Sequence, residues 1–554
     1  MNRWTENLAH LGAALGCIAL LAALGLYLRW PVTEVDMFRN EDVAGITYNA
    51  DLLRHGKVPL VDNLEYKAPG AFFLVHGVWK VWGRSMASME TFGMAWVLLA
   101  AAGMFVAGRF MFGYASGLIA GLIFTVYAPL CDSMTVNYNT WMIAPYVWST
   151  AFFVGGLARG RLWWFVACGV SMTLAALFKR QGGVLFPLYL VVLAALPHLS
   201  LPEGWARPRP RRWMLGYLGG LAAGFVPIGL FYLVEKGFGG LYLFIKHFFF
   251  SSAGWRYVSG ELEWSDKVLQ LEDAFTGFYE FLLLPTILAC LTIVAVPQVR
   301  RRGWAVLGLL LGGHFLLSFI GLSLGFRFYK GYYLHALPAA AWLAAHADGP
   351  LLRWFNPDTR PLGWQRHVGR VFAVGMVLVL VASAGQPGLH ALKQERLQRK
   401  TFNSYQHEAV RIAEHIKKHT RPGDRIWVWG RWAWPVYFHA DRLSVTRFYK
   451  VLGVITNNLT NTWKRPTVMT RYVPGGPDKE IGRQLARGKP AYIVSANNED
   501  YTGFTALEDL LRDRYEPVPM SNVRAFRIWR LKPPPKGKPA SRPAGAKPRE
   551  RGDS

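Results

Sequence analysis

The feature that most constrains this chain is a series of apolar segments, most of them about 17–25 residues long, separated by short polar loops. At 1.5 Å per residue, a helix of about 20 residues crosses the roughly 30 Å hydrocarbon core of a bilayer. Of the 554 residues, 52% are hydrophobic and 23 are Trp, which is more apolar than expected for a soluble enzyme of this length. We therefore expect a polytopic α-helical membrane protein.

Apolar length predicts about eleven transmembrane helices. They cover approximately residues 10–29, 91–110, 114–131, 139–157, 162–178, 183–199, 213–234, 277–297, 303–324, 331–347 and 369–386. The first segment is too long for a signal-peptide core and lacks a small-residue cleavage site before Arg29. It is therefore expected to be retained as the first transmembrane helix.

The distribution of charge supports one orientation in the membrane. With the N-terminus inside, the Arg-rich segments 207–212 and 300–302 fall on the cytoplasmic side, as the positive-inside bias requires. This topology accounts for the net charge of +27 without nucleic acid, so no nucleic-acid partner is expected. The same parity places the loop 30–90, and everything after residue 387, on the outer side.

Composition divides the chain into three predicted parts. A transmembrane module covers 1–390 and includes the outer loop 30–90, a small α/β domain covers 391–531, and a disordered basic tail covers 532–554. The α/β domain is inferred from helical apolar spacing over 407–420 and from short apolar runs typical of strands. These expected strands are 425–430, 436–440, 491–495 and 523–530.

The outer loop 30–90 concentrates acidic residues in a chain that is basic almost everywhere else. Glu34, Asp36, Glu41 and Asp42 follow the first apolar segment. The segment after them has near-helical apolar spacing, which predicts a helix lying in the membrane interface. Acids in a loop are usually a solvated surface, but a carboxylate held at the membrane surface is able to act as general base on an acceptor hydroxyl.

Several cations on the outer side run against the positive-inside bias. They are Lys67, Lys179, Arg180, Lys246, Arg256, Arg327 and Lys330, and His335 adds a further donor near the last two. Snorkelling side chains or an aromatic belt explain single residues of this kind. Together they favour a site for an anion such as a lipid phosphate.

Outward-facing carboxylates and cations on a lipid-embedded body suit one kind of transfer reaction. Cations would hold a departing lipid phosphate while a carboxylate deprotonates the acceptor. No spacing of His, Asp and Glu demands a metal, and no Gly-rich nucleotide loop follows a strand, so no cofactor is expected. The alternatives are a transporter or flippase of lipid-linked sugars, disfavoured because the predicted helix interiors hold almost no ionisable residues, and a non-catalytic envelope-assembly protein.

Four short motifs follow one another in the outer loop. They are Glu41-Asp42, Leu52-Leu53 with Gly56, Pro59 with Asp62, and Lys67-Ala68-Pro69. Their order resembles the Asp-Glu, Leu-Leu-x-Gly, Pro-Tyr-x-Asp and Lys-Pro-Pro motifs of the GT-C superfamily of polyprenyl-phosphate-sugar glycosyltransferases. The similarity is greatest to bacterial members like the protein O-mannosyltransferases of glycosyltransferase family 39 and the lipid A aminoarabinose transferases.

The acid pair is reversed relative to that family, and one extra residue precedes Gly56. Alignment on Leu52 selects Glu41 as the catalytic acid, whereas alignment on Gly56 selects Asp42. Two later segments also resemble the family: Lys179-Arg180-Gln181 is similar to its Lys-Gln outer loop, and 327–338 is similar to its Arg-x-x-x-His-Tyr segment ending in Pro. The second of these has Lys330 where the family often has His or Pro.

The resemblance implies a GT-C fold with an extracytoplasmic cavity between the first loop and the C-terminal domain. The expected catalytic carboxylates are Glu41, Asp42 and Asp36; the expected ligands of the donor phosphate are Lys67, Lys179, Arg180, Arg327, Lys330 and His335; the expected cavity residues are Glu34, Asp62, Tyr332 and Tyr333. The expected partners are a polyprenyl-phosphate sugar donor, a glycan, lipid or protein acceptor, and membrane lipids. The expected location is a bacterial inner membrane, with the C-terminal domain on the periplasmic or extracellular side.

Overall fold

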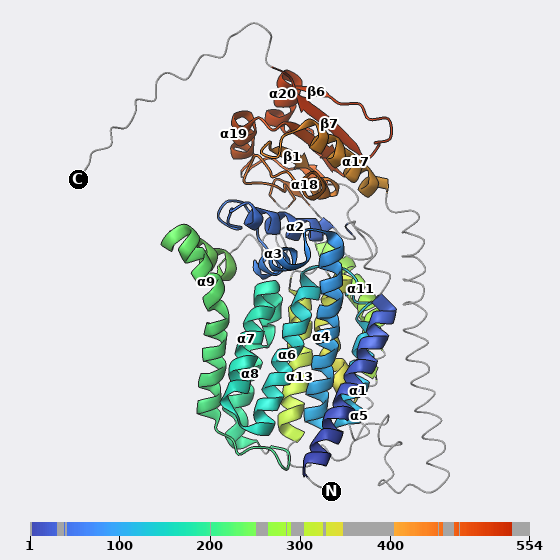
Figure 1. Ribbon diagram of the computed structural model, residues 1–554, viewed down its shortest axis with the longest axis vertical. Helices are drawn as coiled ribbons and strands as arrows, with labels where there is room; N and C mark the ends of the chain where they lie inside the picture. Colours follow the sequence, from blue (N-terminus) through green and yellow to red (C-terminus); the bar gives the residue numbers. More distant parts are fainter. Residues whose placement is uncertain are drawn as a thin grey trace, which may run out of the picture.

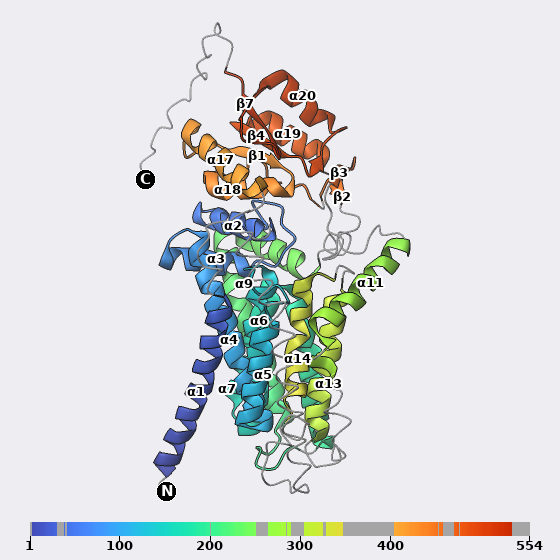
Figure 2. The same cartoon turned by 90° about the vertical axis from the view of Figure 1, so that its right-hand side faces the viewer.

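The computed structural model describes residues 3–29, 38, 41–199, 201–250, 264–283, 285–287, 289, 304–324, 328–346, 404–452, 454–457, 470–475 and 477–533. Three parts stack along the long axis of the molecule: a bundle of long helices, a thin layer that contains α2 and α3, and an α/β region beyond that layer (Figures 1 and 2). The chain thus places its outer loop between its apolar bundle and its C-terminal region.

The bundle is built mainly from helices that are apolar around most of their circumference, together with the amphipathic helix α11. They are α1 (Arg3–Arg29), α4 (Met86–Phe112), α5 (Tyr114–Tyr127), α6 (Tyr138–Arg159), α7 (Leu162–Phe178), α8 (Phe186–Ala195), α9 (Pro210–Phe249), α11 (Trp264–Phe281), α13 (Trp304–Ser323) and α14 (Leu337–Ala344). The 3-10 helices η2 (Arg180–Leu185) and η3 (Leu196–His198) flank α8, and η4 (Lys330–His335) precedes α14.

Within the described residues, six helical segments are long and apolar enough to cross a membrane. They are Leu8–Arg29, Met86–Phe112, Tyr138–Arg159, Arg180–His198, Pro210–Phe249 and Ala305–Ser323, joined by the shorter apolar helices Tyr114–Tyr127 and Leu162–Phe178. The prediction of a multi-pass helical membrane protein is confirmed. The number eleven stays a prediction, because 369–386 and most of the second half of 277–297 lie outside the described residues.

Small residues let two helices of the bundle approach closely. A Cβ on Gly169 of α7 would lie 2.2 Å from the carbonyl oxygen of Tyr217 on α9, and a Cβ on Gly220 of α9 would lie 2.1 Å from that of Val166. Backbone contact through small residues is a common way for membrane helices to associate, because lipid removes the hydrophobic drive between them. The α7–α9 pair therefore depends on both glycines.

Helix α9 changes direction near its C-terminal end. Gly237 has φ 63° and ψ −163°, which is outside the helical region and suits a residue without a Cβ. The segment after Gly237 forms a separate arm at the outer end of the bundle (Figure 1).

The layer that contains α2 (Glu41–Arg54) and α3 (Gly70–Trp82) lies between the bundle and the C-terminal region (Figure 2). The helix predicted after the acid cluster is present as α2, but it is not a surface helix with one side exposed to water. Ile46, Thr47, Asn49 and Ala50 are all fully buried. The C-terminal region covers the face of α2 that the sequence assigns to water.

The C-terminal region is the predicted small α/β unit. Its elements are α17 (Ser404–His419), β1 (Ile426–Trp429), η5 (Arg431–Ala433), α18 (Trp434–Ala440), β2 (Thr456–Asn457), β3 (Thr470–Tyr472), α19 (Asp478–Gly488), β4 (Tyr492–Ala496), β5 (Glu499–Asp500), α20 (Thr505–Arg514), β6 (Tyr515–Pro517) and β7 (Phe526–Leu531). The larger sheet has the order β1-β4-β7-β6, with β1 parallel to β4 and the other pairs antiparallel, and the smaller has the order β2-β3-β5.

Alternation along β1 explains how the sheet is buried on both faces. Ile426 and Val428 pack with residues of α17 and α18, whereas Trp427 and Trp429 pack with residues of α19 and α20. Successive strand side chains point to opposite faces, so a strand covered on both sides reads as a continuous apolar run. This is why β1 is recognisable from the sequence.

One predicted strand is wrong. Residues 436–440 belong to helix α18, whose first turn contains Pro435. A short apolar run does not reveal its period, and Pro in the first turn favours a helix. The predicted helix 407–420 and the strands 425–430, 491–495 and 523–530 correspond to α17, β1, β4 and β7. The predicted boundary at 390 and the tail beyond residue 533 lie outside the described residues.

Candidate functional site

Glu65 fixes the loop between α2 and α3 to the C-terminal region. Its buried carboxylate contacts the Lys450 ammonium and the Tyr449 hydroxyl, and accepts a hydrogen bond from Asn49 Nδ2 at 3.2 Å. The backbone N–H groups of Tyr66 and Lys67 donate to it at 2.7 and 3.0 Å. Burial raises the pKa of Glu65, but Lys450 and the hydrogen-bond donors outweigh burial, so the pKa lies below its usual range. Glu65 is therefore a charged anchor two residues before Lys67.

A second anchor holds α2 from its other end. Asp51 accepts two hydrogen bonds from Arg84, from Nε and Nη2, each at 2.7 Å, and Arg84 Nη2 also donates to the Phe438 carbonyl oxygen at 2.7 Å. The Tyr48 ring stacks on Tyr449 with 4.1 Å between centroids. Bidentate pairing of a guanidinium with a carboxylate fixes both position and orientation. Helix α2 is thus held rigidly at the base of the C-terminal region.

Lys67 and Lys179 approach one another beneath α2. Lys67 Nζ lies 5.2 Å from the centroid of the Tyr138 ring at the start of α6. Lys179, directly after α7, contacts Asn139 Oδ1, and its Nζ lies 3.5 Å from His335 Nε2 and 3.7 Å from the centroid of the Tyr332 ring. Burial and the charge of Lys67 hold the pKa of Lys179 well below its usual range, and Asp42 partly offsets them.

Asp132, in the loop between α5 and α6, is a site residue that the sequence did not indicate. It accepts hydrogen bonds from Thr135 Oγ1 and Asn137 Nδ2, both at 2.7 Å, and has a left-handed φ of 58°. Burial raises the pKa of Asp132 to about 6, with Asp42 adding to this and Lys330 and the two hydrogen bonds opposing it. A lone acid at the edge of a predicted apolar segment is a weak signal, since position alone does not show what faces it.

Asp42 lies in the first turn of α2 and is exposed. Its charge acts on Lys179, Asp132 and Tyr138, which come from three different parts of the bundle. The structure thus brings together a set of side chains that we call the polar cluster: Asp42, Lys67, Asp132, Lys179, Lys330 and His335. Tyr332 contributes the ring that faces Lys179.

Other residues predicted for the site point elsewhere. Arg180 Nη2 donates to the Tyr66 carbonyl oxygen at 3.0 Å and also contacts the His247 carbonyl oxygen. Asp62 accepts from the Val58 N–H at 2.7 Å and from Lys236 Nζ at 3.0 Å. The Tyr333 hydroxyl donates to the Ala274 carbonyl oxygen at 2.8 Å. These three side chains fix the loop and η4 to neighbouring helices.

Three predicted residues lie outside the described residues, namely Glu34, Asp36 and Arg327, and of Glu41 only the backbone, which begins α2, is described. Among the described residues, no group of three or more His, Cys, Asp and Glu side chains is arranged to hold a metal ion. The polar cluster is therefore an arrangement of carboxylates, amines and aromatic rings at the junction of the bundle and the outer layer.

Comparison with known proteins bears on this arrangement. A family model described as dolichyl-phosphate-mannose-protein mannosyltransferase matches residues 66–208, a segment that holds Lys67, Asp132 and Lys179. No curated protein has a significant sequence match to the chain. The structure is similar to that of ArnT from Cupriavidus metallidurans bound to undecaprenyl phosphate, with a TM-score of 0.58 and 15% identity over 93% of this chain and 98% of that chain.

The chain has the GT-C fold. The same GT-C fold is seen in the archaeal oligosaccharyltransferase AglB from Archaeoglobus fulgidus, solved with an inhibitory peptide and a dolichol-phosphate. That similarity has a TM-score of 0.50 and 13% identity, and covers 87% of this chain and 69% of that chain. The fold expected from the motif order in the outer loop is confirmed.

Proposed function

We propose that this protein is a membrane glycosyltransferase that moves a sugar from a polyprenyl-phosphate donor to an acceptor at the outer membrane surface. The observation that carries the proposal is the polar cluster, in which the charges of both Lys67 and Asp42 act on Lys179. Its setting in a GT-C fold supports the proposal, as does the matching family, whose description names transfer of mannose from dolichyl phosphate.

In this proposal Lys67 and Lys179 hold the phosphate of the donor. Two ammonium groups that repel each other are stabilised when an anion lies between them, and bound phosphate would raise the lowered pKa of Lys179. Lys330 and His335 complete the ligand set, with Arg327 as a further proposed member. Arg180, through its hydrogen bonds to two carbonyl oxygens, would position the loop that carries Lys67.

The proposed step exchanges one bond at the anomeric carbon for another. The bond from that carbon to the phosphate oxygen breaks, and its electron pair leaves with the polyprenyl phosphate. A bond from the acceptor to the anomeric carbon forms, and the acceptor proton passes to a carboxylate. Stabilising charge on the leaving phosphate is the larger contribution to rate, and general-base catalysis supplies about 10²–10⁴-fold.

We propose Asp42 as that base. It is exposed, and its charge acts on Lys179, which is one of the proposed phosphate ligands. Glu41 and Asp36 are the alternative bases. Asp132, with a pKa of about 6, is proposed as a second carboxylate able to exchange a proton near neutral pH. Tyr332, Tyr333, Asp62 and Glu34 are proposed to border the substrate cavity.

The remaining organisation is proposed from the sequence. The transmembrane module covers 1–390, the C-terminal domain 391–531 and a disordered tail 532–554. The protein lies in a bacterial inner membrane, with the C-terminal domain on the periplasmic or extracellular side. Its partners are membrane lipids, the polyprenyl-phosphate sugar and a glycan, lipid or protein acceptor.

The test uses the full chain in lipid nanodiscs with labelled polyprenyl-phosphate sugars and an envelope extract as acceptor. Wild type should release polyprenyl phosphate, Asp42→Asn should lower the rate by about 10²–10⁴-fold, and Lys67→Met should weaken retention of the donor. Asp424→Asn is the matched control, because Asp424 lies in the C-terminal region and accepts the Arg421 N–H at 2.8 Å. Full activity in Asp42→Asn, Glu41→Gln and their combination would refute the assignment. Movement of intact donor across a bilayer without release of polyprenyl phosphate would favour the flippase alternative.

A further inference from the structure

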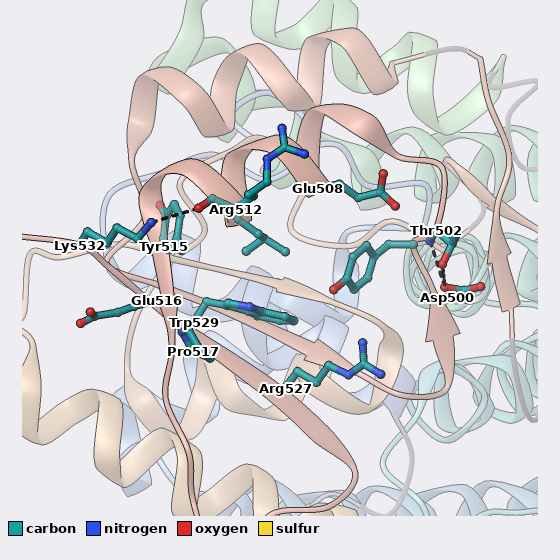
Figure 3. A pocket seen from close by; sticks show the side chains of 12 residues that line it. Asp500, Thr502, Glu508, Arg512, Tyr515, Glu516, Pro517, Arg527, Trp529 and Lys532 are labelled. Carbon is teal, nitrogen blue, oxygen red and sulfur yellow. Dashed lines mark hydrogen bonds between the residues drawn. The ribbon is translucent and has the colours of Figure 1, made fainter.

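A hollow of about 660 Å³ lies on the C-terminal region, beside α20, β6 and β7 and away from the helical bundle (Figures 1 and 3). Its volume falls within the roughly 300–1,000 Å³ typical of small-molecule sites. The polar cluster instead comes from α2, from η4 and from loops at the end of the helical bundle, and none of its residues belongs to the C-terminal region. The hollow is therefore separate from the proposed site of transfer.

Two aromatic side chains form part of the wall of the hollow. Trp529 on β7 and Tyr501 after β5 are each half-buried, with ring centroids 6.2 Å apart and planes at 77°. Tyr501 is supported from behind by Trp429, at 5.9 Å between centroids. Figure 3 shows Trp529 lying along the floor of the hollow, with Arg527 from the same strand beside it. A fixed, partly exposed aromatic pair offers flat apolar surface to a ligand at little entropic cost.

Charged groups of both signs surround these rings. The hollow is lined by the carboxylates Asp500, Glu508 and Glu516 and by the cations Arg512, Arg527 and Lys532. Equal numbers of each sign disfavour a strongly anionic ligand, in contrast to the lysines of the polar cluster.

Two of the lining carboxylates, Asp500 and Glu508, are held in place by hydrogen bonds. Asp500 accepts from Thr502 N at 3.0 Å and from Thr502 Oγ1 at 2.7 Å, and Glu508 accepts from the Gly503 N–H at 3.0 Å. The remaining lone pairs of these carboxylates, with the N–H donors of Arg527 that Tyr501 does not occupy, suit a ligand rich in hydroxyl groups, which both donate and accept.

We propose that this hollow binds a neutral oligosaccharide, a segment of the acceptor or product glycan. Trp529 and Tyr501 stack on the C–H faces of sugar rings, while Asp500, Glu508 and Arg527 form hydrogen bonds with their hydroxyls. The choice of a glycan rests on the proposed function, whereas the aromatic wall and the balanced charge do not. Binding here would hold a long acceptor while one end of it reaches the polar cluster.

The experiment measures binding of neutral mannose and glucose hexasaccharides to the full chain in nanodiscs, by calorimetry and by saturation-transfer NMR. We expect saturable binding in wild type, at least tenfold weaker binding in Arg527→Ala, and no binding in Trp529→Ala. Arg527 is exposed, so its variant reports on the hollow even where loss of Trp529 disturbs folding. Arg524→Ala is the matched control, since Arg524 is also exposed and does not line the hollow.

The inference fails if neither hexasaccharide binds, if binding is equal in Arg527→Ala and Arg524→Ala, or if only a sulfated hexasaccharide or an extended peptide binds. Lys67→Ala should lose transfer and keep hexasaccharide binding. Hexasaccharide binding without any sugar transfer in wild type would refute the proposed function and leave the hollow as a glycan site. Sugar transfer without hexasaccharide binding would refute only the inference that the hollow binds a glycan.

Discussion

Replacing Glu65 with Gln should leave the Lys450 ammonium buried without a counter-ion. The two side chains contact one another where Glu65 is 0% and Lys450 9% exposed. Removing one partner of a buried ion pair costs about 3–5 kcal/mol, because the other charge stays in a poorly solvated place. Gln also keeps only one of the two oxygens, so it loses either the Tyr66 and Lys67 N–H donors at Oε1 or the Tyr449 and Asn49 donors at Oε2. We expect the free energy of unfolding to fall by that amount.

A double-mutant cycle separates this effect from simple truncation. Lys450→Met leaves the Glu65 carboxylate with its hydrogen-bond donors and should cost less than Glu65→Gln. The double variant should be more stable than the two separate losses predict, by up to about 3 kcal/mol. The assay is equilibrium unfolding of the purified chain in one detergent, with protease cleavage of the released C-terminal region as a second readout.

The matched control is Glu516→Gln, which removes an exposed ion pair with Arg530 in the same region and should change little. Because the pKa of Glu65 is below its ordinary value of 4.5, the contribution of the pair is complete well above that value and is lost as pH falls through the lower native pKa. The difference between wild type and Glu65→Gln should therefore be constant from pH 8 to pH 5. A coupling energy below about 0.5 kcal/mol, or a Glu65→Gln variant as stable as the control, would refute this reasoning.

Three further perturbations have clear expected outcomes. Gly70→Ala places a Cβ 2.6 Å from the Leu177 carbonyl oxygen, so α3 must shift. The rate of sugar transfer should then fall at least about tenfold. Gly77→Ala is the control and should be neutral, because a Cβ there meets no atom within 4 Å. Burial raises the pKa of Glu499 from 4.5 to about 7, so its ionisation penalty develops as pH rises through that window. Glu499→Gln should therefore stabilise the chain by up to about 3 kcal/mol at pH 8 and by less than about 0.5 kcal/mol at pH 4.5. Chemical unfolding at both pH values checks this. Lys179→Met should raise KM for the lipid-phosphate donor about tenfold or more and change unfolding little, and steady-state kinetics that show an unchanged KM would contradict its role.

The sequence predicted those parts of the fold that depend on apolar length and on local period. The bundle helices could be found because a membrane helix needs a continuous apolar run, and β1 could be found because both of its faces are buried. Residues 436–440 could not be assigned, since a five-residue apolar run fits a strand or a buried helix equally well. The covered face of α2 could not be predicted either, because the groups that bury it come from residues about 400 positions later.

The candidate site shows the same division. Cations predicted on the outer side break the positive-inside rule, which singles out Lys67, Lys179 and Lys330, and the structure brings these together with His335. Asp132 breaks no such rule, and its setting depends on the turn that joins α5 to α6. Arg180 and Asp62 were also predicted as site residues. In the structure, however, Arg180 donates to the Tyr66 carbonyl oxygen and Asp62 pairs with Lys236 of α9. A charged residue at an unexpected depth in the membrane therefore indicates where a site lies better than it indicates what that residue does there.

The arm of α9 beyond Gly237 has a consequence for how deep the proposed chemistry lies in the bilayer. Phe238, Tyr242 and Phe250 on this arm are 83%, 61% and 76% exposed, as suits aromatic side chains that rest among lipid headgroups. Lys236 at its root holds Asp62, and the His247 carbonyl oxygen near its end receives Arg180. The segment that carries Lys67 is thus tied to an aromatic arm whose surface suits the lipid headgroup region. In bilayers of different thickness we expect this arm to stay with the headgroups while the helices tilt, so that Lys67 would keep its depth relative to the membrane surface.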